Sequence, residues 1–130
     1  DEVNASYDNK LDKEKLAGFK GANGTILYFI DQKTVHNLGE SFPLYKDAFG
    51  VYATHANGMA QINIWNALTT LNLGASLQHY GPAIETWVKE RYQVPENYQL
   101  VAQMPFGKVI TPAEAKDKLP RQEKLTVFEA

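Results

Sequence analysis

A long apolar segment in the middle of the chain constrains the fold more than any other feature of the sequence. It runs from Gly58 to Leu73, and small and aliphatic residues recur in it at helical spacing: Ala60, Ile64, Ala67, Leu68 and Leu71. Ile62 and Trp65 widen the apolar surface beyond one stripe. A helix that is apolar on more than one side needs cover on more than one side. The segment therefore predicts a central helix or a helix at a subunit interface.

The stretch that follows, Leu71 to Pro82 (LNLGASLQHYGP), joins this helix to a second one. Gly74 is expected to end the first helix, and residues 75–80 to form a short strand. Pro82 suits the first turn of the next helix. A tight junction of this kind directs backbone N–H groups and a few polar side chains into one crevice. Such a crevice suits a flat ring with a polar edge.

The composition indicates one ordinary globular domain over residues 1–130. The 130 residues are 44% hydrophobic and 22% charged, and the net charge is −2. The lack of cysteine excludes disulfides, cysteine-based zinc sites and thiol catalysis. There is no dense Lys/Arg stripe for nucleic acid, and no apolar run of the roughly 18 residues that span a bilayer. These two absences lead us to expect no nucleic-acid partner and no membrane partner. Because no secretory signal opens the chain, we also expect a cytoplasmic protein.

Two aspartates mark helix starts before the central helix. Asp12 is an N-cap candidate for the first helix. Asp31 follows a continuous apolar, β-prone run, Thr25 to Ile30, which is typical of a strand buried on both faces. Asp31 can also cap the next helical turn, Gln32 to Leu38.

Residues 39–58 allow two interpretations. Glycines and a proline interrupt them, yet they carry several aromatic side chains, among them Phe49 and Tyr52. The segment is either a short helix and loop that cover the core, or an aromatic wall over a pocket.

The C-terminal part combines a strand with a long polar tail. Tyr98 to Phe106 alternates apolar and other residues, which predicts a strand with one half-exposed side. Residues 109–130 carry a polar segment with two prolines before the β-prone Leu125 to Phe128. A short strand after a long polar arm does not easily close a local hairpin. The tail, residues 109–130, is therefore expected to reach a partner chain as an added edge strand.

The side chains offer no complete catalytic apparatus of their own. The sequence lacks a GxGxxG motif, a P-loop, an HExxH motif and a GxSxG motif. His36, His55 and His79 are not spaced as metal ligands, and no carboxylate pair stands out for acid–base catalysis. A chain like this either binds something or takes its chemistry from a cofactor.

Several segments resemble the flavin-dependent nitroreductase family, in particular its fatty-acid-repression-like branch. They are GTILYFID, FPLYKDAF, GMAQINIWNALTTLNLGASLQHYGP, QLVAQMPFGKV and TPAEAK, and the resemblance runs from about Leu16 to Phe128. GASLQHY and QMPFG are the most specific parts. The resemblance implies an α+β fold with a mixed, mainly antiparallel sheet flanked by helices. It also implies an intertwined homodimer that exchanges C-terminal strands.

The resemblance further implies an FMN site. It places Ala75, Ser76, Leu77, Gln78 and His79 beside the flavin, where backbone N–H groups and the Gln78 side chain contact the polar edge of the ring. The competing interpretation is a plain strand with Gln78 facing solvent. NAD(P)H would reduce the flavin, and a nitroaromatic or a quinone would take the electrons in a ping-pong cycle.

Two further groups of residues receive roles from the resemblance. Lys116, Arg121 and Lys124 in the tail would reach the flavin phosphate, or else they are solvated charges on a polar arm. Phe49 and Tyr52 would wall the substrate pocket, or else they belong to the core.

The chain also departs from the family pattern. An N-terminal Arg-Arg-Ser/Thr motif and an Asn-x-Gln segment, which hold flavin in the family, are absent, and the chain begins at Asp1. We expect a processed protein, a C-terminal piece or a shortened form. Two alternatives to an FMN-dependent oxidoreductase stay open. One is a flavin-poor regulatory or binding relative in lipid metabolism or stress response, and the other is a non-catalytic dimerisation piece.

Overall fold

The computed structural model describes residues 5, 7 and 12–128. The ends of the expected domain and tail, residues 1–4 and 129–130, lie outside them. The strands are β1 (Gly24–Asp31), β2 (Leu73–Ala75) and β3 (Tyr98–Lys108). The helices are α2 (Lys13–Lys20), α3 (Gln32–Ser41), α4 (Phe49–Thr70) and α5 (Gly81–Tyr92), with the 3-10 turns η1 (Pro43–Ala48) and η2 (Arg121–Glu123).

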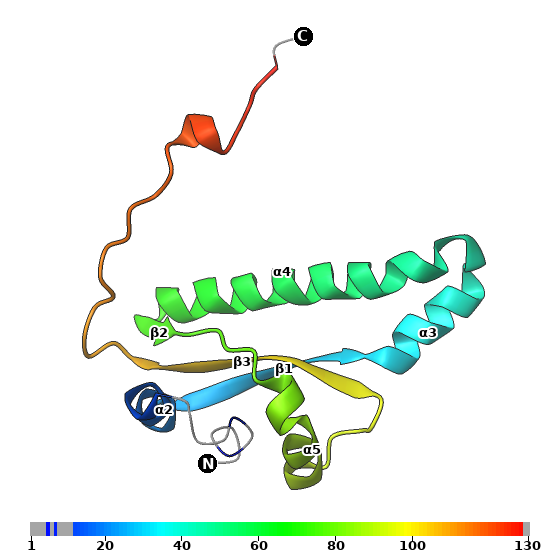
Figure 1. Cartoon of the computed structure of the whole chain (residues 1–130), viewed down its shortest axis with the longest axis horizontal. Helices are drawn as coiled ribbons and strands as arrows, with labels where there is room; N and C mark the ends of the chain where they lie inside the picture. The colour runs from blue at the N-terminus through cyan, green and yellow to red at the C-terminus, as the bar shows by residue number, and fades with distance from the viewer. Residues whose placement is uncertain (1–4, 6, 8–11, 129–130) are drawn as a thin grey trace.

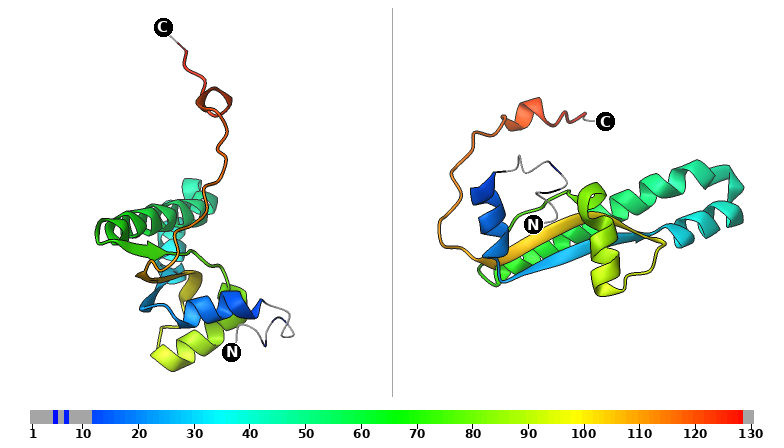
Figure 2. Two further views of the ribbon diagram at one scale, coloured as in Figure 1. Left: turned by 90° about the vertical axis from the view of Figure 1, so that its left-hand side faces the viewer. Right: turned by 60° about the horizontal axis from the view of Figure 1, so that its bottom comes forward.

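These elements form three layers. Helix α4 crosses one face of the sheet, whereas α2 and α5 lie on the other face (Figure 1). Helix α3 continues from the end of β1 and, with η1, leads back into α4, so that this helical hairpin projects beyond the sheet (Figures 1 and 2). The expectation of an α+β fold with helices flanking an antiparallel sheet is confirmed.

The sheet has the order β1-β3-β2, and both strand pairs are antiparallel. The register between β1 and β3 shifts once, because Tyr28 pairs with Ala102 whereas Phe29 pairs with Leu100. Val101 is therefore an extra residue in β3, which makes a β-bulge. The bulge lies beside α4 and interrupts the ladder of backbone hydrogen bonds.

Strand β3 has a core on each side. On the α4 side, Tyr28 and Leu68 pack with Ala102 and Met104. On the α5 side, the cluster consists of Leu100, Ile84 and Val88. The expected half-exposed side of this strand is therefore wrong for its middle, because helices cover both faces. β1 was expected to be buried on both faces. It is half-buried instead, with Tyr28 as its one buried residue, because it lies at the edge of the sheet.

Both aspartate caps are confirmed. The Asp12 carboxylate accepts a hydrogen bond from the backbone N–H of Glu14 at 2.8 Å. The Asp31 carboxylate accepts from the N–H of Lys33 at 3.0 Å and from the hydroxyl of Thr34 at 2.6 Å. Asp31 thus ends β1 and starts α3 within one residue.

The central helix differs from its expected bounds. It begins at Phe49 rather than Gly58, and it ends at Thr70, before Gly74. The chain reverses at Asn72, whose φ of 58° lies in the left-handed region that asparagine tolerates. Gly50 and Gly58 lie inside the helix because its contacts with the sheet and with η1 outweigh the weak helix propensity of glycine.

The tail does not pack on the described domain. Residues 109–128 leave the sheet beside β2, extend away from it, and are exposed throughout (Figures 1 and 2). Leu125 to Phe128 form no strand within this single chain, so their pairing with a partner stays a prediction. Among the described residues, no helix is long and apolar enough to cross a membrane.

Candidate functional site

The segment from Leu71 to Pro82 joins α4 to α5 along the edge of the sheet. Residues 73–75 pair with the end of β3 as β2, and Gln78 then makes an isolated bridge with Gln103. The expected strand over residues 75–80 is therefore mostly wrong, since regular pairing stops at Ala75. Pro105, which stands opposite Ser76, has no N–H to donate, so the ladder loses a hydrogen bond at this point.

The backbone of this segment faces β3 at every second residue. The N–H of Ser76 donates to the carbonyl of Pro105 at 3.0 Å, and that of Gln78 donates to the carbonyl of Gln103 at 2.7 Å. Because successive N–H groups of an extended chain point in opposite directions, those of Leu77 and His79 point away from β3. Neither makes a hydrogen bond within the part of the chain that the structure describes. The edge therefore presents two free backbone donors.

The side chains of the segment also fall into two groups, because two of them pack against the core and the others do not. Ala75 and Leu77 are half-buried and pack against the core beneath α4. The Gln78 amide donates to the Ser76 hydroxyl at 2.7 Å, so these two side chains support each other. His79 is exposed.

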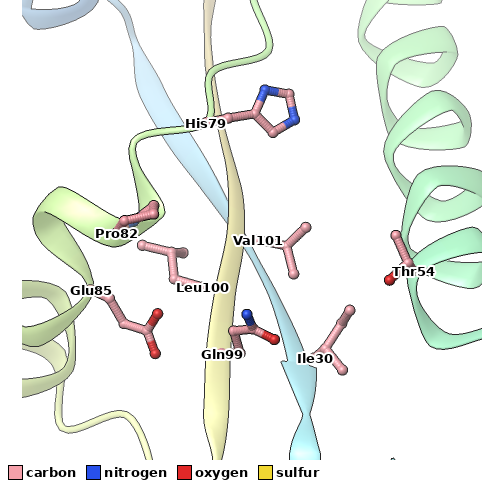
Figure 3. A pocket seen from close by; sticks show the side chains of 8 residues that line it. All are labelled: Ile30, Thr54, His79, Pro82, Glu85, Gln99, Leu100 and Val101. Atoms are coloured by element: carbon pink, nitrogen blue, oxygen red, sulfur yellow. The ribbon is translucent and has the colours of Figure 1, made fainter. Parts of the chain in front are cut away.

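A pocket of about 370 Å³ opens beside His79. Ile30 and Val101 lie in its floor, Thr54 of α4 stands on one side, and Pro82 stands at the start of α5 on the other (Figure 3). The His79 ring extends toward the α4 side. This volume is in the usual range for small-molecule sites.

The charges at this pocket balance. Glu85 lines it, and the Glu85 carboxylate pairs with the ammonium group of Lys89 at 2.7 Å. At another part of the lining, the Gln99 carbonyl oxygen accepts a hydrogen bond from the Gln32 amide at 2.6 Å. The pocket thus suits a neutral group better than a phosphate.

The expected aromatic residues do form a cluster, in a different place. The ring centroids of Phe42 and Phe49 are 6.2 Å apart, and those of Phe49 and Tyr52 are 6.1 Å apart with an edge-to-face angle of 87°. These rings pack together near the start of α4 and are not among the residues that line the pocket beside His79.

The expected phosphate-binding cations are not brought to the segment in a single chain. Lys116, Arg121 and Lys124 all lie on the exposed tail, which extends away from β2 (Figure 1). His36 and His55 are exposed on α3 and α4. Within the described ranges, no group of three His, Cys, Asp or Glu residues is arranged to hold a metal ion.

Gln103 is the residue that sequence interpretation missed. It is only 5% exposed, and it contacts the 78–80 segment through both its backbone and its side chain. The signal in the sequence was a polar residue between apolar neighbours in LVAQMPF, at a position that β-alternation assigns to one face of a strand.

Comparison with known proteins shows the family of the chain. The model of the nitroreductase family matches residues 1–108. The chain belongs to the nitroreductase family. HBN1 of Saccharomyces cerevisiae is 34% identical over 117 residues, which are 89% of this chain and 60% of that protein. The nitroreductase FRM2 of the same yeast is 35% identical over 86 residues, 66% of this chain and 44% of that protein. FRM2 is named for fatty acid repression. This match therefore confirms the expected resemblance to the fatty-acid-repression-like branch.

Solved nitroreductases share the fold. CinD from Lactococcus lactis in complex with chloramphenicol superposes with a TM-score of 0.91 at 39% identity, covering 98% of this chain and 67% of that one. CinD was also solved with nicotinic acid and with 4-nitrophenol. The chain spans about half the length of the two yeast relatives, 60% of HBN1 and 44% of FRM2. Membership of this nitroreductase family supports a flavin-dependent oxidoreductase in general terms.

Proposed function

We propose that the chain contributes one wall of an FMN site in an NAD(P)H-dependent oxidoreductase that reduces nitroaromatics or quinones. One observation carries the proposal. At the open edge of the sheet, the backbone N–H groups of Leu77 and His79 point outward without partners in the described part of the chain. Family membership supplies the cofactor class.

The residues of the segment fit the polar edge of a flavin ring. When bound, flavin supplies the hydride chemistry that the side chains of this chain lack. Backbone N–H donors that are already oriented stabilise negative charge on a bound ring without further reorganisation. Half-buried Ala75 and Leu77 hold these donors against the core, and the bond between Gln78 and Ser76 keeps polar side chains beside them.

We assign the binding of the FMN phosphate to the cations of the tail. Lys116, Arg121 and Lys124 are exposed on the tail, so their side chains would be available to bind an anion once the tail docks. Because the pocket beside His79 has no Lys or Arg in its lining, we assign the phosphate to these tail cations and the ring to the segment.

The proposed substrate class rests on the flat aromatic ligands of a related protein. The related CinD was solved with chloramphenicol and with 4-nitrophenol. In this chain, the edge-to-face pair Phe49 and Tyr52 offers an aromatic surface for such molecules. We assign it to the substrate wall, where it would act together with a second subunit.

A homodimer is part of the proposal. Helix α4 leaves several apolar side chains exposed, among them Val51, Met59 and Ile62. The apolar end of the tail is also uncovered. Apolar surface of this extent marks an association site, and a second copy that exchanges tails would cover both surfaces.

Titration of the purified protein with FMN tests the proposal. Flavin fluorescence should be quenched saturably, and the complex should oxidise NADH or NADPH when a nitrobenzene or a benzoquinone is added. A protein that stays colourless and leaves FMN fluorescence unchanged contradicts the proposal and favours a flavin-free binding role. The same titration with riboflavin, which lacks the phosphate, measures what the tail cations contribute.

A further inference from the structure

Gln103 is a buried polar residue that holds the segment around His79. Its backbone N–H donates to the carbonyl of Gln78 at 2.9 Å, and its carbonyl accepts from the N–H of Gln78 at 2.7 Å. Its side-chain carbonyl oxygen accepts from the backbone N–H of Tyr80 at 2.8 Å. One residue of β3 therefore fixes the residues on both sides of His79.

The next residue is also held against β3. At Gly81, a Cβ atom would lie 2.5 Å from the carbonyl oxygen of Leu100, so the backbone approaches too closely for any other residue without a shift. Tyr80 is the N-cap of α5, and no side chain makes a capping bond there. The chain therefore passes from the bridge at Gln78 into α5 along one fixed course, and His79 forms the outward step between two anchored neighbours.

The Gln103 amide is retained at a cost. Its Nε2 is buried and has no hydrogen-bond partner within the described part of the molecule. A buried donor without an acceptor lowers stability, and a methionine of similar length would fill the same space without that loss. The favourable contribution of this side chain is the one hydrogen bond that its carbonyl oxygen accepts from the backbone N–H of Tyr80.

We propose that Gln103 is a positioning residue of the flavin site. By holding Gln78 and Tyr80 against β3, it fixes the two peptide groups around His79 and so directs the free His79 N–H outward. The inference rests on the proposed function, because the donor matters for catalysis only where flavin binds. Gln103 itself is buried under the segment, so we assign it no direct contact with the ring.

The substitution Gln103→Met tests this role. The Tyr80 ring still packs on the Phe19 ring at a centroid distance of 6.3 Å, so the start of α5 retains a second anchor and the variant should fold. In the flavin-free protein, the Tyr80 amide should exchange with solvent about tenfold faster. FMN should bind about tenfold more weakly, and the midpoint potential of the bound flavin should fall, since the reduced ring loses an oriented donor.

Gln61→Met is the matched control, because Gln61 is the other buried glutamine among the described residues and its side-chain amide bonds to Asn57 rather than to the segment. It should change thermal stability and leave the Tyr80 amide exchange and the flavin potential as in wild type. Gln103→Glu keeps an oxygen facing the Tyr80 N–H, so it should restore slow exchange of that amide.

The outcomes separate the two proposals. A wild-type protein that binds no FMN overturns the proposed function and the positioning role with it. A wild-type protein that binds FMN, together with a Gln103→Met variant of unchanged affinity and potential, overturns the positioning role alone. If Gln103→Met fails to fold, the wild-type protein still decides, because a Tyr80 amide that exchanges as fast as the His79 amide rules out the clamp.

Discussion

The side-chain amide of Asn57 donates a hydrogen bond of 3.1 Å to the backbone carbonyl of Phe29. Phe29 lies where the register of β1 and β3 shifts, so a ladder carbonyl is free at this point. The side-chain amide of Gln61, one turn further along α4, donates to the side-chain Oδ1 of Asn57 at 2.6 Å and so orients the Asn57 amide. The bulge region and the central helix are thus joined by the Asn57 amide, and Gln61 of the same helix orients that amide.

Replacing Asn57 with alanine should therefore destabilise the fold. The substitution leaves the Phe29 carbonyl and the Gln61 amide without partners, and we expect the free energy of unfolding to fall by about 2 kcal/mol. Urea unfolding followed by circular dichroism measures the change. Asn66→Ala, at an exposed position on the same helix, is the control and should stay within about 0.5 kcal/mol of wild type. Equal effects at the two sites would contradict the assigned role of Asn57.

Gly81→Ala should be more harmful than an ordinary substitution at a helix start. The added Cβ would lie 2.5 Å from the Leu100 carbonyl oxygen, which is backbone and cannot move aside alone. We expect a loss of about 2 kcal/mol or more in unfolding free energy. Gly18→Ala is the control, since nothing lies within 4 Å of a Cβ there, and it should raise stability by roughly 0.5–1 kcal/mol. A neutral Gly81→Ala would show that α5 does not approach β3 this closely.

The cap at Asp31 should make stability depend on pH in the acid range. The hydroxyl of Thr34 is the main cause that lowers the pKa of the Asp31 carboxyl, with the Asn97 amide and the N–H groups of Thr34 and Lys33 adding to it. Because the folded pKa lies below the unfolded one, this stabilisation is complete above the unfolded pKa. It is lost as the pH falls through the folded pKa.

Melting temperatures between pH 6 and pH 3 measure this effect. Asp31→Asn removes the ionisable group, so its melting temperature should fall less steeply toward acid than that of wild type. At neutral pH, it should lie about 4 °C below wild type, because one amide oxygen replaces two carboxylate acceptors. Asp117→Asn, on the exposed tail, is the control. An acid profile of Asp31→Asn that is parallel to wild type would contradict the prediction.

The tail should contribute to dimerisation. Val127 and Phe128 are 68% and 89% exposed in the single chain, which leaves apolar side chains in water. Deleting residues 121–130 or introducing Val127→Asp should weaken the dimer at least about tenfold in sedimentation, since burial of one such side chain is worth about 1.5–3 kcal/mol. The control is Lys118→Ser, which changes the net charge by the same amount as Val127→Asp and should leave the dimer intact. Unchanged sedimentation of both tail variants would refute tail exchange.

Sequence interpretation worked where a local rule decides the structure. Asp12 and Asp31 cap helices through their own neighbours, and the apolar pattern around Leu68 places one helix over the core. It failed where tertiary contacts overrule local preference. Gly50 and Gly58 argued against a helix, yet α4 runs through both because the sheet and η1 support it.

The place of the candidate site was proposed from the sequence, whereas its geometry was not. Sequence interpretation selected the segment Ala75 to His79, but the alternation of its hydrogen bonds depends on pairing with a distant strand. Only the fold shows that the N–H groups of Ser76 and Gln78 donate hydrogen bonds to β3. Those of Leu77 and His79 therefore remain available as donors. The role of Gln103 is hidden for the same reason, because its partner Tyr80 is distant in sequence and becomes its neighbour through a single bridge.

Amide hydrogen exchange of Leu77 and His79, measured by NMR without and with saturating FMN, tests the central claim most directly. If these two outward N–H groups form the wall of a flavin site, both should exchange fast in the free protein and become protected when FMN is added. The amides of Ser76 and Gln78, already bonded to β3, should change little. FMN that binds and leaves the Leu77 and His79 amides exchanging as fast as before would contradict the account.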